Sequence, residues 1–141
     1  MSKLDDRRDA IRTLVRNESI RTQRELADRL RELGYDCTQA TISRDITELR
    51  LEKPAGSCYM LPEDMRFQRI IHELVNSAVA AMNIVVVKTM SGSANAVAEV
   101  LDTSKFEGLL GTVAGDNTIM IVTDDPEHAQ NLTDKLNSLI A

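Results

Sequence analysis

Two short helices are encoded by residues 22–49, TQRELADRLRELGYDCTQATISRDITEL. Thr22 and Glu25 have the spacing of a capping box, which begins a helix, and apolar residues then recur at helical spacing. Gly34 is expected to end this helix, because glycine adopts the left-handed conformation without penalty. After a short connection, Thr38 is expected to cap a second helix. Two short helices joined by a tight turn that contains glycine predict a helix-turn-helix motif.

The second helix of this pair has two different faces. A stripe of apolar residues at i, i+4 and i+7 begins at Ile42, and Arg44 points nearly opposite to it, flanked by Ser43 and Thr47. A small polar surface around an arginine is typical of a helix that enters the major groove of DNA. The alternative for Arg44 is an ordinary surface ion pair with Glu48, four residues further along the helix.

The residue types on this face match the chemistry of DNA. Arg44 could donate two parallel hydrogen bonds to O6 and N7 of guanine, the commonest specific contact in the major groove. Ser43 and Thr47 suit phosphates or base edges, and Thr38 and Gln39 lie at the helix N-terminus, which favours anions. We therefore expect these five residues to bind DNA.

The flanking segments complete a winged helix-turn-helix domain. Residues 4–16 have the apolar stripe of a first helix, and residues 51–61 read as a β-hairpin, which is the wing. A polar stretch that begins with proline follows the hairpin, and apolar content rises after it. We therefore expect a DNA-binding domain over residues 1–62, a linker over 63–68 and a second domain over 69–141.

The second half of the chain predicts a different architecture. A strand is expected over residues 73–79, although residues 67–75 could equally begin as a helix. The remaining elements are a strand at 84–89, a helix at 94–102, strands at 109–114 and 118–122, and a helix at 126–140. The order ββαββα indicates an antiparallel sheet with both helices on one face, a two-layer α+β fold. The other face of the sheet then has to be covered, and another subunit is the simplest covering.

The charge distribution agrees with this division. The chain of 141 residues has a net charge of −5 and a pI of about 5.0, whereas DNA-binding domains are usually basic. Residues 1–60 hold 12 lysines and arginines against 11 acidic residues, and residues 61–141 hold 5 against 11. The basic side chains thus gather in the half that is expected to bind DNA, although ordinary solvated helix faces would produce the same count.

Other classes of function find little support in the sequence. Cys37 and Cys58 have no CxxC spacing, and His72 and His128 are isolated, so we expect no metal site. No nucleophile–base constellation or Walker-type loop is present, so we expect no enzyme. Without a signal peptide or a spanning apolar run, the chain is expected to be cytoplasmic with no membrane partner. Its cysteines are then expected to be reduced, with redox control of the DNA-binding helix as the alternative.

Several motifs together resemble the bacterial arginine repressors. TQATISRDI (38–46) is similar to the recognition helix of that family, and YMLP (59–62) is similar to the end of its wing. GSANA (92–96), the pair Leu101-Asp102, and GTVAGD (111–116) resemble the segments of its ligand site. The resemblance covers nearly the whole chain, with the two sets of motifs in the same order as in the family.

The resemblance implies an arginine-responsive transcription regulator that represses arginine biosynthesis, with activation of catabolism as a further possibility. In this family, trimers stack into hexamers through the C-terminal domains, L-arginine binds as co-repressor at the trimer–trimer interface, and the N-terminal domains bind palindromic operators. Ser43 and Arg44 would be the main DNA-reading residues, supported by Gln39. The effector site would be lined by Asn95, Asp102, Thr112, Ala114, Gly115 and Asp116.

One position departs from the family pattern. Two consecutive aspartates usually follow the last glycine of that motif, and this chain has Asp116 and Asn117. Because carboxylates recognise a guanidinium group in pairs of charge-assisted bonds, Asn117 is expected to weaken arginine binding. Two alternatives therefore stay open: a regulator of the same fold that senses another amino acid, and an architectural DNA-binding protein without ligand control.

Overall fold

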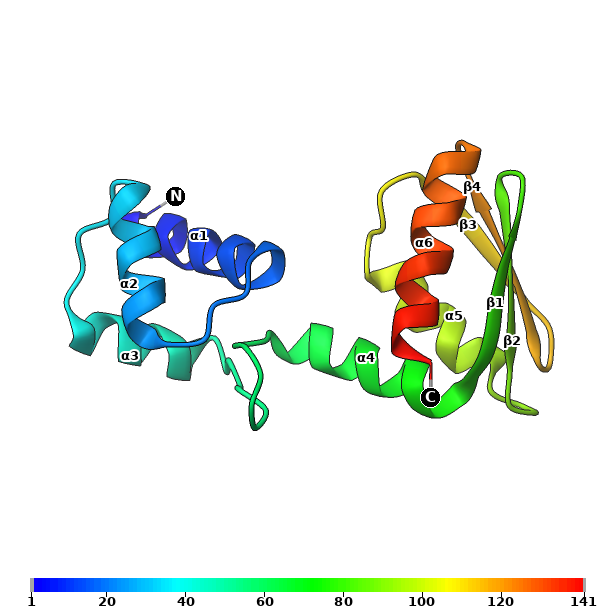
Figure 1. Ribbon diagram of the computed structural model, residues 1–141, viewed down its shortest axis with the longest axis horizontal. Helices are drawn as coiled ribbons and strands as arrows, with labels where there is room; N and C mark the ends of the chain where they lie inside the picture. The colour runs from blue at the N-terminus through cyan, green and yellow to red at the C-terminus, as the bar shows by residue number, and fades with distance from the viewer. Residues whose placement is uncertain (1, 141) are drawn as a thin grey trace. The chain divides into compact units, whose positions relative to one another are not determined.

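The structure is a computed structural model that describes residues 2–140. The chain folds into two units, of which the N-terminal one extends to Met65 and the C-terminal one begins at Arg66. The helices of the N-terminal unit are α1 (Lys3–Asn17), α2 (Gln23–Glu32) and α3 (Gln39–Glu48) (Figure 1).

An aliphatic core holds these three helices together. Ile11 of α1, Leu26 and Leu30 of α2, and Ile42 of α3 are completely buried. Leu26 and Leu30 are four residues apart and therefore lie on the same side of α2. Burying an aliphatic side chain of this size contributes about 1.5–3 kcal/mol. The apolar spacing seen in the sequence thus accounts for the packing of this unit.

Side chains begin α2 and α3 as the sequence predicts. Thr22 Oγ1 accepts a hydrogen bond from the backbone N–H of Glu25 at 3.0 Å, and Thr38 Oγ1 accepts one from Thr41 at 3.3 Å. The carboxylate of Glu25 reaches back to the N–H of Arg21, at 3.1 Å, and not to that of Thr22. The capping box is therefore present with its return bond shifted by one residue.

The predicted wing is present only as a minimal hairpin. Glu52 and Met60 form a single antiparallel bridge with N–O distances of 3.1 and 2.7 Å, in place of two strands. Pro54 has no N–H to donate, and it limits the length of the ladder. The N–H of Tyr59 donates to the carbonyl of Ile20 at 2.8 Å, so the hairpin is fastened to the connection between α1 and α2.

The expected linker, residues 63–68, contains the boundary between the two units and is helical, as part of α4 (Pro62–Leu74). A proline in the first turn is tolerated, and the two acidic residues after it favour a helix N-terminus. Phe67 and Ile71 then lie one turn apart and are buried in the core of the C-terminal unit. Because this packing holds the helix as far as Leu74, the first strand begins at Val75 and not at residue 73.

The C-terminal unit is a four-stranded antiparallel sheet with two helices packed against it. Its elements are β1 (Val75–Ala81), β2 (Ile84–Thr89), α5 (Ala94–Thr103), β3 (Leu109–Ala114), β4 (Thr118–Thr123) and α6 (Pro126–Leu139). The strands are ordered β1-β2-β4-β3, and α5 and α6 lie on the same face of the sheet (Figure 1). The α+β class and the predicted order of elements are confirmed.

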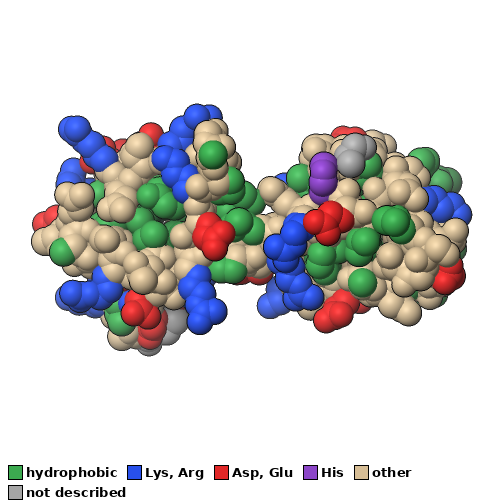
Figure 2. Space-filling view, turned by 90° about the horizontal axis from the view of Figure 1, so that it is seen from below, with side chains coloured by type: hydrophobic (Ala, Val, Ile, Leu, Met, Phe, Trp, Pro, Cys, Tyr) green, Lys and Arg blue, Asp and Glu red, His purple; other side chains and the backbone are tan. Residues whose placement is uncertain are grey.

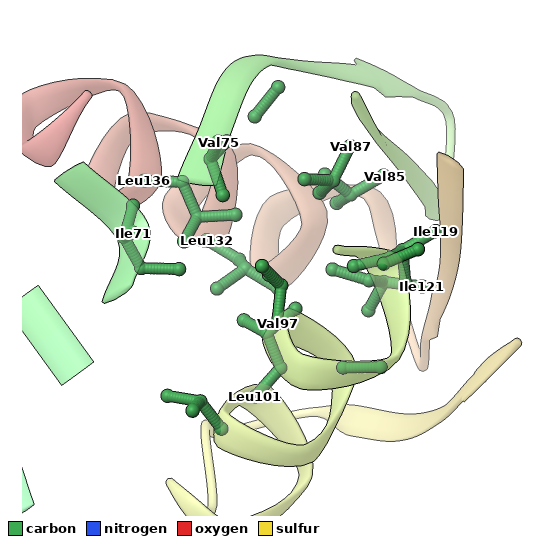
Figure 3. Close-up of a cluster of buried hydrophobic side chains, with 14 of the residues drawn as sticks. Ile71, Val75, Val85, Val87, Val97, Leu101, Ile119, Ile121, Leu132 and Leu136 are labelled. Carbon is green, nitrogen blue, oxygen red and sulfur yellow. The ribbon is translucent and has the colours of Figure 1, made fainter. Parts of the chain in front are cut away.

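The face of the sheet under the helices forms the core of this unit. Val85 and Val87 of β2 and Ile119 and Ile121 of β4 are completely buried. The helix side chains that meet them come from both helices (Figure 3): Val97 and Leu101 from α5, and Leu132 and Leu136 from α6. In each strand the two buried residues are two positions apart, because alternate side chains point to the same face of a sheet. Their β-branched side chains are the ones that favour strands, and they made these strands predictable from the sequence.

The opposite face of the sheet carries a row of exposed apolar side chains. Val79, Val86, Met120 and Val113 are paired across the four strands in that order. Val79 is 62% exposed, Met120 48% and Val113 69%. Neither helix of this unit covers the face, and contiguous apolar surface of this kind marks an interaction site.

A histidine that stands alone in the sequence belongs to an acidic cluster in the structure. His128 Nδ1 lies 2.5 Å from Asp124 Oδ1, and the backbone N–H of His128 donates to Asp125, the cap of α6, at 2.7 Å. The hydrogen bond with Asp124 raises the pKa of His128 above its ordinary value, and the charges of the nearby carboxylates add to this effect. The atoms of Asp124, Asp125 and His128 that could act as metal ligands, the carboxylate oxygens and a ring nitrogen, lie within 4.8 Å of one another.

We expect Gly108→Ala to destabilise the C-terminal unit more than Gly92→Ala does. Both glycines have φ of +78°, where alanine costs about 1–2 kcal/mol. A Cβ at Gly108 would also lie 2.5 Å from Asp124 Oδ1 and closer still to His128, whereas nothing lies within 4 Å of one at Gly92. This overlap adds about 1–3 kcal/mol. Urea unfolding at equal protein concentration measures both losses, and equal losses would contradict the expectation.

Candidate DNA interface and effector site

The five residues expected to bind DNA lie on the exposed surface of α3 and its cap. Gln39, Ser43 and Thr47 recur every four residues and form one row, with Arg44 beside it. Two of the hydroxyls have local partners, since Thr38 caps the helix and Thr47 Oγ1 donates to the carbonyl of Ser43 at 3.1 Å. Within residues 2–140, the side chains of the other three form no hydrogen bond, so their polar groups are free for a ligand.

Arg44 differs from most arginines of the N-terminal unit because no acidic partner holds it. Among the residues described, the ion pair with Glu48 is not formed. The paired arginines are Arg7, Arg8, Arg12, Arg16, Arg29 and Arg31. The arginines of this unit that have no acidic partner among residues 2–140 are Arg21, Arg24, Arg44 and Arg50. Figure 2 shows basic and acidic side chains interspersed on this unit. Although the net charge of this half is close to zero, some of its arginines have no acidic partner in the described chain and can bind other anions.

A hollow between α2 and α3 adds a feature that the sequence did not reveal. It has a volume of about 480 Å³ and is lined by Arg24 of α2 and Gln39 of α3, among others. Arg24 therefore lies on the same surface as the row of Gln39, Ser43 and Thr47 that is expected to bind DNA, although it comes from the preceding helix. The only signal in the sequence is its position next to the capping box, where the first helix of such a motif crosses the DNA backbone.

The inner face of α3 is fixed to α1 by a buried carboxylate. Asp45 is completely buried and accepts two bonds from Arg7, at 2.6 Å from Nε and 3.0 Å from Nη2. Arg8 Nε donates a third bond at 3.2 Å. Burial alone would raise the pKa of Asp45, but the hydrogen bonds and charges of the two arginines outweigh burial and hold this pKa below its ordinary value.

We expect the N-terminal unit to lose stability in acid through Asp45. Because the folded state lowers the pKa of this carboxyl, its contribution is present at neutral pH and is lost as pH falls through the folded pKa, below about pH 4. The free energy of unfolding measured in urea between pH 3 and pH 6 should therefore depend less on pH in Asp45→Asn. Asp9→Asn, which removes an exposed pair with Arg12, is the control that should keep the slope of the wild type.

Two groups of expected effector residues lie at opposite ends of α5. Near its start, Asp116 Oδ2 accepts from Ser91 Oγ at 3.2 Å, and the carbonyl of Asp116 accepts from the N–H of Ala94 at 3.2 Å. Near its end, Asp102 Oδ1 accepts from Thr112 Oγ1 of β3 at 2.9 Å. Positions 94 and 102 are separated by about 12 Å along the helix axis, so the two carboxylates do not meet in one chain.

The remaining expected effector residues surround these two carboxylates without joining them. Asn95 is exposed in the first turn of α5, Ala114 is half-buried at the end of β3, and Gly115 is exposed in the turn that follows. Asn117 Oδ1 accepts from Thr118 Oγ1 at 3.0 Å. All of them lie along α5 and the β3–β4 hairpin.

The two cysteines are free, as expected, and both are half-buried. Burial raises the pKa of the Cys37 thiol above its ordinary value, and this lowers the fraction of reactive thiolate at neutral pH. Cys37 lines the hollow between α2 and α3, where its partial burial favours the neutral thiol, which is less reactive. Redox control of the DNA-binding helix is therefore disfavoured.

Both halves of the chain match models of one protein family. Residues 1–67 match the model described as "Arginine repressor, DNA binding domain", and residues 71–138 match "Arginine repressor, C-terminal domain". The chain belongs to the arginine repressor family. The family is one of transcription regulators, and membership confirms the expectation of a DNA-binding regulator that is not an enzyme.

Individual members of the family are similar over almost the whole chain. The arginine repressor of an Exiguobacterium strain is 41% identical, over 92% of this chain and 94% of its own length. Those of Halothermothrix orenii and Heliobacterium modesticaldum are 41% and 42% identical with the same coverage. Nothing in residues 2–140 forms a helix that is both long and apolar enough to cross a bilayer.

Proposed function

We propose that this chain represses transcription in the cytoplasm by binding palindromic operators as a hexamer whose affinity for DNA is controlled by L-arginine. Residues 1–62 bind DNA, and residues 69–141 assemble the hexamer and bind the ligand. The observation that carries the proposal is the outer row of α3, where Gln39, Ser43 and Arg44 have no partner within the described chain, on a segment that matches the family's DNA-binding domain.

In the proposed complex, α3 lies in the major groove. Arg44 donates two bonds to a guanine, and Ser43 and Gln39 contact neighbouring base edges. Thr38 donates to a phosphate at the start of the helix, and Thr47 does the same near its end once its hydroxyl leaves the carbonyl of Ser43. The N-terminus of α3 is oriented so that its dipole favours a phosphate near its cap.

A second copy of the chain is the proposed covering of the exposed sheet face. The row that contains Val79, Met120 and Val113 is apolar and crosses all four strands, which suits a flat contact with another apolar sheet face. A small domain buries little of its own surface, so association supplies stability that one copy lacks. Trimers that pair into hexamers also bring several DNA-binding units to one operator, which raises the overall affinity.

The separation of the two carboxylates supports a ligand site between copies. A single amino acid placed between Asp102 and Asp116 would leave much of its surface uncovered by one chain, so in our proposal another subunit completes the site. Asp116 is exposed in its turn, and several copies that meet would repel one another. L-Arginine relieves this repulsion and binds the assembled state more tightly, and such differential binding is what gating requires.

Asn117 favours a second candidate, a regulator of the same family that senses a different amino acid. Asn117 removes one negative charge per subunit from the turn next to Asp116, and its side-chain oxygen is already bonded to Thr118. A ligand with less positive charge would then lose less on binding than a guanidinium does. An architectural DNA-binding protein without ligand control is the third candidate. No contact among the described residues favours it.

The decisive test is a titration of an operator-like palindromic duplex with and without L-arginine, beside sedimentation of the same samples. If L-arginine tightens DNA binding and shifts trimers to hexamers, the proposal is supported. If DNA binding is present but unaffected by L-arginine, a screen of other amino acids decides between the second and third candidates. If no duplex is bound, the proposed DNA function is wrong.

We expect Arg44→Ala to weaken operator binding by about 1–3 kcal/mol, because a bidentate contact with guanine is lost. Arg12→Ala is the matched control. Arg12 is also exposed, on α1, but it is paired with Asp9 and lies outside the proposed interface. Fluorescence anisotropy with a labelled operator measures both affinities, and an equal loss in the two variants would contradict the assignment of Arg44.

We expect Asn117→Asp to tighten binding of L-arginine by about tenfold or more, because it restores a charge-assisted bond to the guanidinium. The turn should be preserved, since an aspartate oxygen can still accept from Thr118. Asn131→Asp on the exposed surface of α6 adds the same charge away from the site and serves as control. Titration calorimetry decides, and the same change in both variants would indicate an effect of net charge alone.

A further inference from the structure

Asp45 follows Arg44 directly in α3, yet its side chain is completely buried. Every other charged side chain that the structure describes is at least partly exposed. Removing a carboxylate from water is costly unless it is paired and its oxygens are satisfied. Charged residues on the surface keep a protein soluble, but the buried Asp45 cannot serve that purpose. Its position next to Arg44, the main residue proposed to read DNA, therefore requires another explanation.

Both oxygens of Asp45 are satisfied by two arginines of α1, in what we call the Asp45 cluster (Asp45, Arg7 and Arg8). Arg7 binds the carboxylate through Nε and Nη2 in two roughly parallel bonds, and Arg8 binds Oδ1 from a second direction. The side chains of Arg7 and Arg8 are themselves only 18% and 23% exposed. A planar guanidinium that binds a carboxylate by two bonds fixes the relative orientation of the two groups.

The apolar contacts of α3 do not fix orientation in this way. Ile42 and Leu49 are buried on the same side of the helix as Asp45, but apolar contacts carry no preferred direction. A rotation of α3 about its own axis would repack such side chains at small cost. Because Asp45 and Arg44 are adjacent on a rigid helix, any rotation that kept Ile42 buried but moved Asp45 would turn Arg44 by the same angle.

We propose that Asp45 is a positioning residue for DNA recognition: held by Arg7 and Arg8, it fixes the rotation of α3 and thereby the direction in which Ser43 and Arg44 meet the base edges. The inference rests on the proposed DNA-reading role of α3. Its physical basis is that a buried ion pair adds little net stability, whereas in some proteins a buried polar group fixes one arrangement of the packed helices. Loss of the cluster should therefore reduce the preference for one DNA sequence before it reduces binding to DNA in general.

The test compares Asp45→Asn and Arg7→Lys with the wild type as full-length chains. Kd is measured for two duplexes: one that the wild type selects from a randomised palindromic pool, and a scrambled duplex of the same length and composition. We expect the ratio of the two Kd values to fall by about 10- to 100-fold, the size of lost base discrimination. Kd for the scrambled duplex should stay close to that of the wild type, since phosphate contacts carry no sequence information.

Two matched controls separate positioning from stability. Ile42→Val loosens the packing of α3 without touching the Asp45 cluster, and Arg12→Lys makes the same chemical change as Arg7→Lys at an exposed pair on α1. Both should keep the wild-type ratio, even where Ile42→Val lowers the unfolding midpoint. All measurements are made well below the lowest of these midpoints.

The outcomes are distinct. If both cluster variants keep the wild-type ratio while their unfolding midpoints fall as that of Ile42→Val does, Asp45 is only structural and the inference is wrong. If Asp45→Asn does not fold, Arg7→Lys decides, because it keeps the charge and loses the two-bond geometry. If the wild type itself does not prefer its selected duplex, the proposed DNA function fails, and the inference fails with it.

Discussion

The C-terminal unit buries one face of its sheet under α5 and α6 and leaves the other apolar face exposed. This one-sided burial is the constraint on which the rest of the architecture depends. A sheet whose row of Val79, Val86, Met120 and Val113 meets water is unfavourable, by about 25 cal/mol for each Å² of apolar surface. The proposed association would remove that surface from water and would thereby also stabilise the fold.

The same constraint explains where the candidate ligand residues lie. Asp116 and Asp102 mark the two ends of α5, and β3, which carries Thr112, is an edge strand of the sheet. Edge strands and helix ends lie at the boundary of a subunit, where another copy can approach them. In the proposed assembly, a site divided in this way would be completed by a second copy, and a ligand that filled it would stabilise the oligomer.

Short-range chemistry made much of the fold predictable. Thr38 caps α3, and Gly34 ends α2 with φ of +94°, because these interactions involve residues only a few positions apart. The strands of the C-terminal unit were predictable from runs of β-branched residues. Residues 63–68 contain the boundary between the two units, but their polar composition hides the helix they form, because the burial of Phe67 depends on the distant C-terminal core.

The candidate sites divide in the same way. The exposed row of α3 that is proposed to bind DNA could be predicted from the sequence, because it depends only on the spacing of residues within one helix. Asp45, by contrast, looks like one more polar residue of that helix, and its burial depends on Arg7, 38 residues away in the sequence. The bond between Asp102 and Thr112 was equally invisible to spacing, and those residues were identified through resemblance to the family alone.

The division of the arginines into paired and free ones has a consequence for binding thermodynamics. An arginine held by a buried carboxylate, as Arg7 and Arg8 are, neutralises no phosphate, so not every basic residue of the N-terminal unit can displace condensed cations from DNA. Each phosphate neutralised releases about 0.9 counterion from duplex DNA. One DNA-binding unit alone therefore gains less entropy from released ions than its count of basic residues suggests, and in the proposed hexamer the electrostatic part of the affinity would grow with the number of units that engage the operator.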